Sequence, residues 1–146
     1  MKRILVATDG SEGADRAVKY AAHWAKNVGA ELLIVNVIGA HGLPEKVFLA
    51  FTRPQQVWLD ELLTSLSAEL LTKAQAHARA AGAGVIILES RSGDDAAQTI
   101  IDIAQEKSAD AIVTGKRGES KFAAMLIGSV SQKLVSLAPL PVVVVP

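Results

Sequence analysis

The chain has 146 residues, half of them hydrophobic, with 15 basic and 15 acidic side chains and no cysteine. This length predicts a single domain over residues 1–146, and the apolar fraction is ample for a buried core. The balanced charge argues against nucleic acid as a partner, because proteins that bind nucleic acids carry a basic excess. The lack of cysteine excludes disulfide frameworks, thiolate metal sites and cysteine nucleophiles.

The first residues do not form a targeting segment. The basic pair Lys2-Arg3 precedes the apolar run Ile4–Ala7, but Thr8-Asp9-Gly10 interrupts that run too early for a signal-peptide core. No later stretch reaches the roughly 20 apolar residues that a membrane helix needs. We therefore expect a cytoplasmic protein that does not enter a membrane.

Short apolar runs alternate with segments of helical spacing along the chain. The runs are rich in β-branched residues and apolar on both faces, which is typical of strands buried on both sides of a parallel sheet. In chain order we predict a strand at Ile4–Ala7, a helix from Ala14 to Val28, a strand at Leu32–Ile38, a helix from Leu59 to Ala81, a strand at Val85–Leu88, a helix from Ala97 to Ala104, a strand at Ala111–Thr114, a helix from Val130 to Ala138 and a strand at Val142–Val145. This alternation predicts the α/β class, with helices on both faces of a parallel sheet.

The connection Gly39–Gln56 interrupts the alternation. It contains Pro44 and Pro54, yet also the apolar run Val47–Leu49. We interpret it as a long, partly apolar connection over the ligand end of the sheet, or as a contact for a partner.

The segment from Gly115 to Ser129 is the most informative part of the sequence. Gly115 and Gly118 follow the fourth strand, and Gly128 precedes the last helix. Glycine allows a phosphate to approach the backbone closely, and the amides at a helix N-terminus donate hydrogen bonds to it. These glycines therefore predict a phosphate site, although each could also be a simple turn residue.

Polar side chains in the same segment strengthen this hypothesis. Ser129 can cap the last helix and also offer its hydroxyl to a phosphate. Lys116 and Arg117 place positive charge beside the glycines. The sequence contains no G-x-x-x-x-G-K-[ST] loop, and no G-x-G-x-x-G pattern follows the first strand, so neither a P-loop motor nor a nicotinamide dehydrogenase is supported.

The spacing of these residues resembles that of a known family. Gly115-x-x-Gly118, nine residues and then Gly128-Ser129 match the G-2x-G-9x-G-(S/T) motif of ATP-binding universal stress proteins. The opening Ile4–Ser11 and the ending Ala138–Val145 also look like the first and last strands of that family with their flanking turns. The resemblance covers essentially the whole chain, as a single-domain member.

The resemblance implies a Rossmann-like sheet of five parallel strands in the order 3-2-1-4-5. It also implies that ATP, or ADP or AMP, binds at the ends of the first and fourth strands, with Mg²⁺ or Mn²⁺ as a possible companion. The implied nucleotide-binding residues are Ala7, Thr8, Asp9, Val37, Thr114, Gly115, Lys116, Arg117, Gly118, Gly128, Ser129 and Val130. Family members usually form homodimers through the last strand, here Val142–Val145, and this apolar strand would need a cover.

Several polar residues have two interpretations. Asp9 is either a nucleotide contact or a cap for the first helix, and both roles are compatible. Ser11 is better interpreted as an N-cap than as a nucleophile, since no nucleophile elbow surrounds it. Asp94-Asp95 is better interpreted as a helix start than as a metal site, and the histidines have no metal-ligand spacing.

The sequence favours binding over catalysis. ATP hydrolysis needs a residue that orients water, and none stands out. The first hypothesis is therefore a stress-response protein in which nucleotide occupancy acts as a switch for an unknown protein partner. A slow ATPase or phosphotransferase in which Lys116 or Arg117 stabilises charge is the second. A partner-binding protein with a vestigial pocket is the third.

Overall fold

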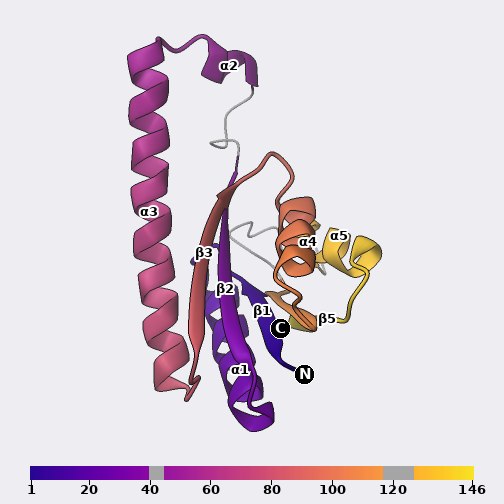
Figure 1. The fold of residues 1–146 in the computed structure, drawn as a ribbon. Helices are drawn as coiled ribbons and strands as arrows, with labels where there is room; N and C mark the ends of the chain where they lie inside the picture. The colour runs from indigo at the N-terminus through magenta and orange to yellow at the C-terminus, as the bar shows by residue number, and fades with distance from the viewer. Residues whose placement is uncertain (40–44, 117–126) are drawn as a thin grey trace.

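The computed structural model describes residues 1–39, 45–116 and 127–146. Within them, the strands form one parallel sheet in the spatial order β3 (Ile86–Ser92), β2 (Glu31–Ile38), β1 (Arg3–Ala7), β4 (Ala111–Gly115) and β5 (Val142–Val145) (Figure 1). The predicted α/β class and the strand order 3-2-1-4-5 are confirmed.

Helices cover both faces of this sheet (Figure 1). Because side chains alternate along a strand, Ile4 and Val6 of β1 point to one face and Leu5 points to the other. The first face packs against α1 (Glu12–Val28) and α3 (Arg53–Ala80). The second face packs against α4 (Ala96–Glu106) and α5 (Ser129–Leu137). The helices that follow β1 and β4, which are neighbours in the sheet, therefore lie on opposite faces.

Capping residues define where the helices begin and end. The Ser11 side chain accepts a hydrogen bond from the Ala14 N–H at the start of α1. Gly29 ends α1 with φ of 70°, a left-handed conformation that glycine adopts without steric cost. At the start of α4 the Asp95 side chain accepts from the Gln98 N–H. The predicted capping role of Ser11 is therefore confirmed, and Asp95 of the acidic pair 94–95 caps the start of α4 as predicted.

The connection after β2 is more ordered than the sequence predicted. Residues 45–49 form the short helix α2 (Glu45–Leu49), and α3 begins at Arg53 and not at Leu59. Thr52 and Gln55 form a capping box that starts α3 before its apolar stripe begins. The sequence analysis did not predict the helical structure of residues 45–49 and 53–56 within this connection.

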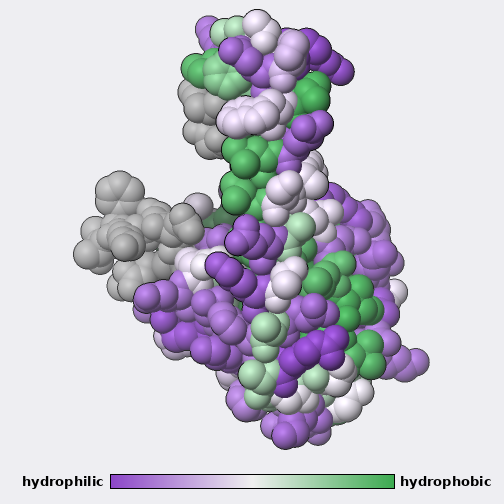
Figure 2. Space-filling view, turned by 90° about the vertical axis from the view of Figure 1, so that its left-hand side faces the viewer, coloured by the Kyte–Doolittle hydropathy of each residue, from purple (hydrophilic) through white to green (hydrophobic). Residues whose placement is uncertain are grey.

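The first turns of α3 extend beyond the sheet (Figure 1). Hydrophobic surface is visible along this part of the molecule in Figure 2. Leu62 and Leu66 of α3 are 39% and 50% exposed. Although α3 has 28 residues, neither it nor another helix in the described ranges is apolar enough over a long enough stretch to cross a membrane.

Strand β3 continues past the predicted end at Leu88, as far as Ser92. Its second half carries Glu89 and Arg91, whose side chains form an ion pair at 3.3 Å. Charged side chains are common on an edge strand because one side of it is not covered by another strand. A search for runs that are apolar on both faces therefore missed this half.

Candidate functional site

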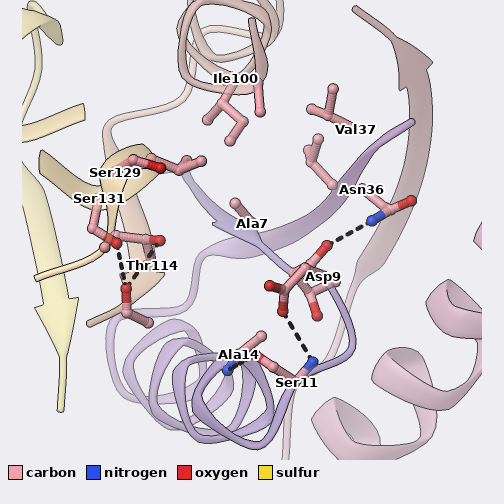
Figure 3. A pocket seen from close by; sticks show the side chains of 16 residues that line it. Ala7, Asp9, Ser11, Ala14, Asn36, Val37, Ile100, Thr114, Ser129 and Ser131 are labelled. Atoms are coloured by element: carbon pink, nitrogen blue, oxygen red, sulfur yellow. Dashed lines mark hydrogen bonds between the residues drawn. The ribbon is translucent and has the colours of Figure 1, made fainter. Parts of the chain in front are cut away.

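A cavity of about 290 Å³ opens at the carboxyl ends of β1 and β4 (Figure 3). The helix after β1 lies on one face of the sheet and the helix after β4 on the other, so the two connections diverge at this point. Ligands of open α/β sheets bind at such a switch point. The cavity is therefore the candidate site.

Most of the residues that the sequence singled out come together here. The cavity lining includes Ala7, Thr8, Asp9, Val37, Thr114, Gly115, Gly128, Ser129 and Val130. Lys116 is half-buried and lies outside the lining, where its N–H donates to the Val145 carbonyl at 2.8 Å. Arg117 and Gly118 lie outside the described residues. Apart from Lys116, the described residues of the predicted site therefore line one cavity.

The sequence analysis did not select the remaining lining residues, Ser11, Ala14, Val35, Asn36, Ala96, Ile100 and Ser131. Ala96 and Ile100 lie one turn apart on α4 and both line the cavity, where Ile100 faces Ala7 (Figure 3). The sequence analysis placed Ile100 in a predicted helix and gave it no role in the site. Asn36 could have been recognised from the sequence, because it is the polar residue in the otherwise apolar run from Leu32 to Ile38.

The turn after β1 is held by local hydrogen bonds. Asp9 Oδ1 accepts from the Ser11 N–H at 2.9 Å, and Thr8 Oγ1 accepts from the Gly10 N–H at 3.2 Å. Gly10 has φ of 81°, which suits glycine in this turn. Asp9 thus shapes the turn into α1 and also lines the cavity, so the two interpretations of this residue are compatible.

The N-terminus of α5 lies on the other side of the cavity. Its N-cap is Gly128, which makes no side-chain capping bond, so the prediction that Ser129 caps this helix was wrong. The Gly128 N–H donates to the Lys116 carbonyl at 2.7 Å. Within the described residues, the backbone N–H groups of Ser129, Val130 and Ser131 have no backbone acceptor. These N–H groups and the positive end of the helix dipole form a site for negative charge.

Gly115 is required by the packing of α1. A Cβ atom at this position would lie 2.9 Å from the carbonyl oxygen of Gly13 and 3.0 Å from its carbonyl carbon. The first turn of α1 therefore occupies the space that a side chain would need. The Gly115 carbonyl accepts from the hydroxyl of Ser131 at 2.5 Å, which joins β4 to the start of α5. Gly115 thus holds two helix N-termini beside the cavity.

Between β1 and β2 the backbone pairing ends inside the cavity. The Thr8 N–H donates to the Val35 carbonyl at 2.9 Å, and pairing of the two strands ends with Ala7 and Val35. The backbone N–H and C=O groups of the odd-numbered residues of β2 point toward β1. Those of Val37 therefore point to a place beyond the last residue of β1. Within the described residues the Val37 N–H has no backbone partner on that side. A hydrogen-bonding strand edge is therefore exposed to the cavity.

Directly before Ala96, Asp95 fixes the start of α4. The hydrogen bond from the Gln98 N–H lowers the pKa of Asp95 below its ordinary value, and Lys133 of α5 adds to this effect. The Lys133 ammonium lies 3.3 Å from Asp95 Oδ2. This exposed ion pair joins α4 and α5, the two helices that border the cavity on this face of the sheet.

Together, the fold and the site define a Rossmann-like α/β protein. The cavity at its switch point is lined in part by backbone groups without backbone partners among the described residues. The model of the universal stress protein family matches residues 1–146, and the chain belongs to that family. It is 32% identical over 144 residues to the universal stress protein YxiE of Bacillus subtilis, with 98% of this chain and 97% of that protein covered.

Solved structures agree with this assignment. The universal stress protein UspA from Lactobacillus plantarum superposes with a TM-score of 0.82 at 26% identity, covering 99% of this chain and 97% of the other. A universal stress protein in complex with cAMP superposes with a TM-score of 0.73, also at 26% identity, covering 99% and 95%. The resemblance seen in the sequence is therefore confirmed.

Proposed function

We propose that this protein binds an adenine nucleotide, with ATP as the expected ligand, in the cavity at the ends of β1 and β4. The observation that carries the proposal is the convergence of two sets of unpaired backbone groups on one cavity, from the edge of β2 and from the N-terminus of α5. The similar protein in complex with cAMP supports an adenine ligand.

The β2 edge suits adenine. Val37 offers an N–H donor and a carbonyl acceptor on the side where β1 has ended. Adenine presents the complementary pair, the N1 acceptor and the N6 donor, whereas guanine presents the reverse. Ala7, Val37 and Ile100 provide apolar contacts for the two faces of the base. We therefore expect the site to select adenine over guanine.

The start of α5 suits the phosphates. The N–H groups of Ser129 and Val130, together with the Ser129 hydroxyl, line the cavity opposite the β2 edge. Lys116 directly follows β4, at the beginning of the segment that leads to α5, and Arg117 is expected to add charge. In the described part of the cavity Asp9 is the acidic lining residue. A Mg²⁺ or Mn²⁺ ion would therefore be held mainly by the phosphates, as is usual for Mg²⁺.

We further propose that nucleotide occupancy acts as a switch in a stress response, and that the protein works as a homodimer in the cytoplasm. Strand β5 is an edge strand whose described neighbour is β4 alone. Val142, Val143 and Val144 are half-buried in the single chain. Pairing of this edge with a second copy would satisfy its backbone groups and cover its apolar side chains.

Calorimetric titration with ATP, AMP and GTP tests the binding proposal. We expect ATP and AMP to bind and GTP to bind at least tenfold more weakly. Bound ligand also raises the melting temperature, because it stabilises the folded state alone. Absence of binding by every adenine nucleotide at millimolar concentration would contradict the proposal and favour a protein whose pocket is vestigial.

Two substitutions at Ser129 separate its hydroxyl from its backbone amide. Ser129→Ala removes the hydroxyl, and Ser129→Pro also removes the N–H. Proline is tolerated at the first position of a helix, and the extended conformation of Gly128 (ψ 161°) is compatible with a following proline. We expect ATP affinity to fall modestly in the alanine variant and by about tenfold or more in the proline variant. Equal ATP affinity in all three proteins would place the phosphates elsewhere.

A further inference from the structure

Asn36 is a buried polar residue at the centre of the site. Its side chain is 9% exposed and lines the cavity wall. The amide nitrogen donates to the Thr8 carbonyl at 2.8 Å, as Figure 3 shows. The amide oxygen accepts from the hydroxyl of Ser67 on α3 at 2.6 Å. A backbone carbonyl can only accept a hydrogen bond, so the amide nitrogen of Asn36, and not its oxygen, must face the Thr8 carbonyl.

Ser67 is itself held in place. It is 3% exposed, and its hydroxyl oxygen lies 2.9 Å from that of Ser90 on β3. The chain of hydrogen bonds therefore runs from β3 through α3 and Asn36 to the turn after β1. Both ends of the Asn36 amide are bound, so the side chain has one defined orientation.

The Thr8 carbonyl is the next acceptor in the pairing of β1 with β2. After the Thr8 N–H donates to the Val35 carbonyl at 2.9 Å, a continuing parallel ladder would join the Val37 N–H to the Thr8 carbonyl. The strand pairing stops before this bond, and the Thr8 carbonyl accepts from Asn36 instead. The side-chain amide thus replaces a backbone donor of the ladder.

We propose that Asn36 is a positioning residue that keeps the backbone ladder open at Val37. By holding the Thr8 carbonyl, it leaves the Val37 N–H available to the base of a bound nucleotide. Ser67 maintains Asn36 in this orientation. The identity of the occupant rests on the proposed function, whereas the opening of the ladder does not.

A purely structural role for Asn36 predicts different behaviour. A buried amide that only anchors α3 to the sheet would affect stability when it is replaced, and it would leave the Val37 amide unchanged. A positioning role changes the hydrogen bonding of Val37 itself. Amide hydrogen exchange of Val37, measured by NMR in the nucleotide-free protein, therefore distinguishes the two roles.

We expect the Val37 amide of the native sequence to exchange quickly relative to that of Val35, which lies inside the paired region. In Asn36→Leu, a substitution of similar size without a donor, the Thr8 carbonyl becomes free and the Val37 N–H closes the ladder. Its exchange should then slow at least tenfold. Slow exchange in the native sequence, or unchanged exchange in Asn36→Leu, would overturn the proposal.

Nucleotide binding provides the second readout. In Asn36→Leu the affinity for AMP should fall about tenfold, the effect of one well-placed hydrogen bond, while binding of inorganic tripolyphosphate stays within twofold. Ser67→Ala should show a smaller loss for AMP, and Ser90→Ala the smallest, because Ser90 is linked to Asn36 through Ser67. Equal losses for AMP and tripolyphosphate would indicate general damage and contradict the proposal.

The two readouts also separate this proposal from the proposed function. If the native protein binds no adenine nucleotide, the proposed function fails, yet the exchange of the Val37 amide still decides the role of Asn36. If the native protein binds AMP while Asn36→Leu binds it equally well, the positioning role alone fails. Should Asn36→Leu not fold, Ser67→Ala supports or overturns the proposal by the same two measurements.

Discussion

The two ends of the sheet satisfy their backbone groups in different ways. At the amino end, the Asp110 carboxylate accepts from the N–H groups of Lys2 and Arg3 at 2.6 and 3.0 Å. The Arg3 guanidinium also donates to Glu31 and to the Lys107 carbonyl. At the carboxyl end, the backbone of Val37 and the first turn of α5 remain without backbone partners among the described residues. Among the described residues, one end is closed by side chains, and the other has backbone groups without partners beside the cavity.

The comparison shows which substitutions should affect binding and which only stability. Hydrogen-bond donors near a cavity must be held rigidly by groups that do not compete with the ligand. Gly115, Ser131 and Asn36 meet this requirement, because each fixes the backbone around the cavity through its own contacts. At the amino end the contacts of Asp110 and Arg3 hold strand ends together far from the cavity.

Gly115→Ala should have the largest effect at the carboxyl end. The new Cβ would lie 2.9 Å from the Gly13 carbonyl oxygen, a backbone atom that cannot move without displacing α1. We expect a loss of about 1–3 kcal/mol in the free energy of unfolding, which urea titration measures, and weaker nucleotide binding. The matched control is Gly84→Ala, where a Cβ would meet nothing within 4 Å. Equal stability of the two variants would refute the close packing of α1 on β4.

Much of the fold could be predicted from the sequence because its central strands are apolar on both faces. Leu5 and Val6 of β1 are fully buried on opposite faces, which produces the continuous apolar run that indicates a parallel sheet. The same rule failed for the polar half of β3, which lies at an edge. It also failed at Thr52, where a capping box and not hydrophobic periodicity starts α3.

The site could be predicted only in part, since glycine spacing identifies the loops but not what each glycine does. The sequence suggested that Gly115 admits a phosphate, whereas its missing side chain makes room for the backbone of Gly13. Ile100 and Asn36 come from elements distant in sequence, and their place in the cavity depends on how β2 and α4 pack. For Asn36, the sequence did offer one indication, since a polar residue inside an apolar strand needs a hydrogen-bonding partner.

Ser131→Ala should have a smaller effect than Gly115→Ala. Ser131 is 4% exposed, and its hydroxyl donates to the Gly115 carbonyl at 2.5 Å. Among the described residues, the donor that then remains for this carbonyl is the Thr114 hydroxyl at a long 3.4 Å, so we expect a loss of about 1 kcal/mol in stability. ATP affinity should fall several-fold, because the start of α5 is no longer fixed to β4. Ser136→Ala, at an exposed position of the same helix, is the control and should change neither quantity.

Asp110→Asn tests the opposite end of the sheet and should have the smallest effect at neutral pH. The N–H groups of Arg3 and Lys2 lower the pKa of Asp110 below its ordinary value. The folded state therefore binds fewer protons than the unfolded state as the pH approaches the unfolded pKa of about 3.9, and stability rises with pH there. This contribution is fully present above that pH and is lost as the pH falls through the lower, folded-state pKa.

The asparagine variant lacks the charge, so its stability should be slightly lower than that of the native sequence at neutral pH. The difference should shrink as the pH falls below about 3.9 and disappear below the folded-state pKa, where the native carboxyl also becomes protonated. Urea titrations at several pH values measure both quantities. ATP affinity at neutral pH should be unchanged, because the hydrogen bonds of the Asp110 carboxylate hold the start of β1, at the end of the sheet opposite the cavity. A fall in ATP affinity would show that the closed end of the sheet also controls the open end, and the division between the two ends would then be wrong.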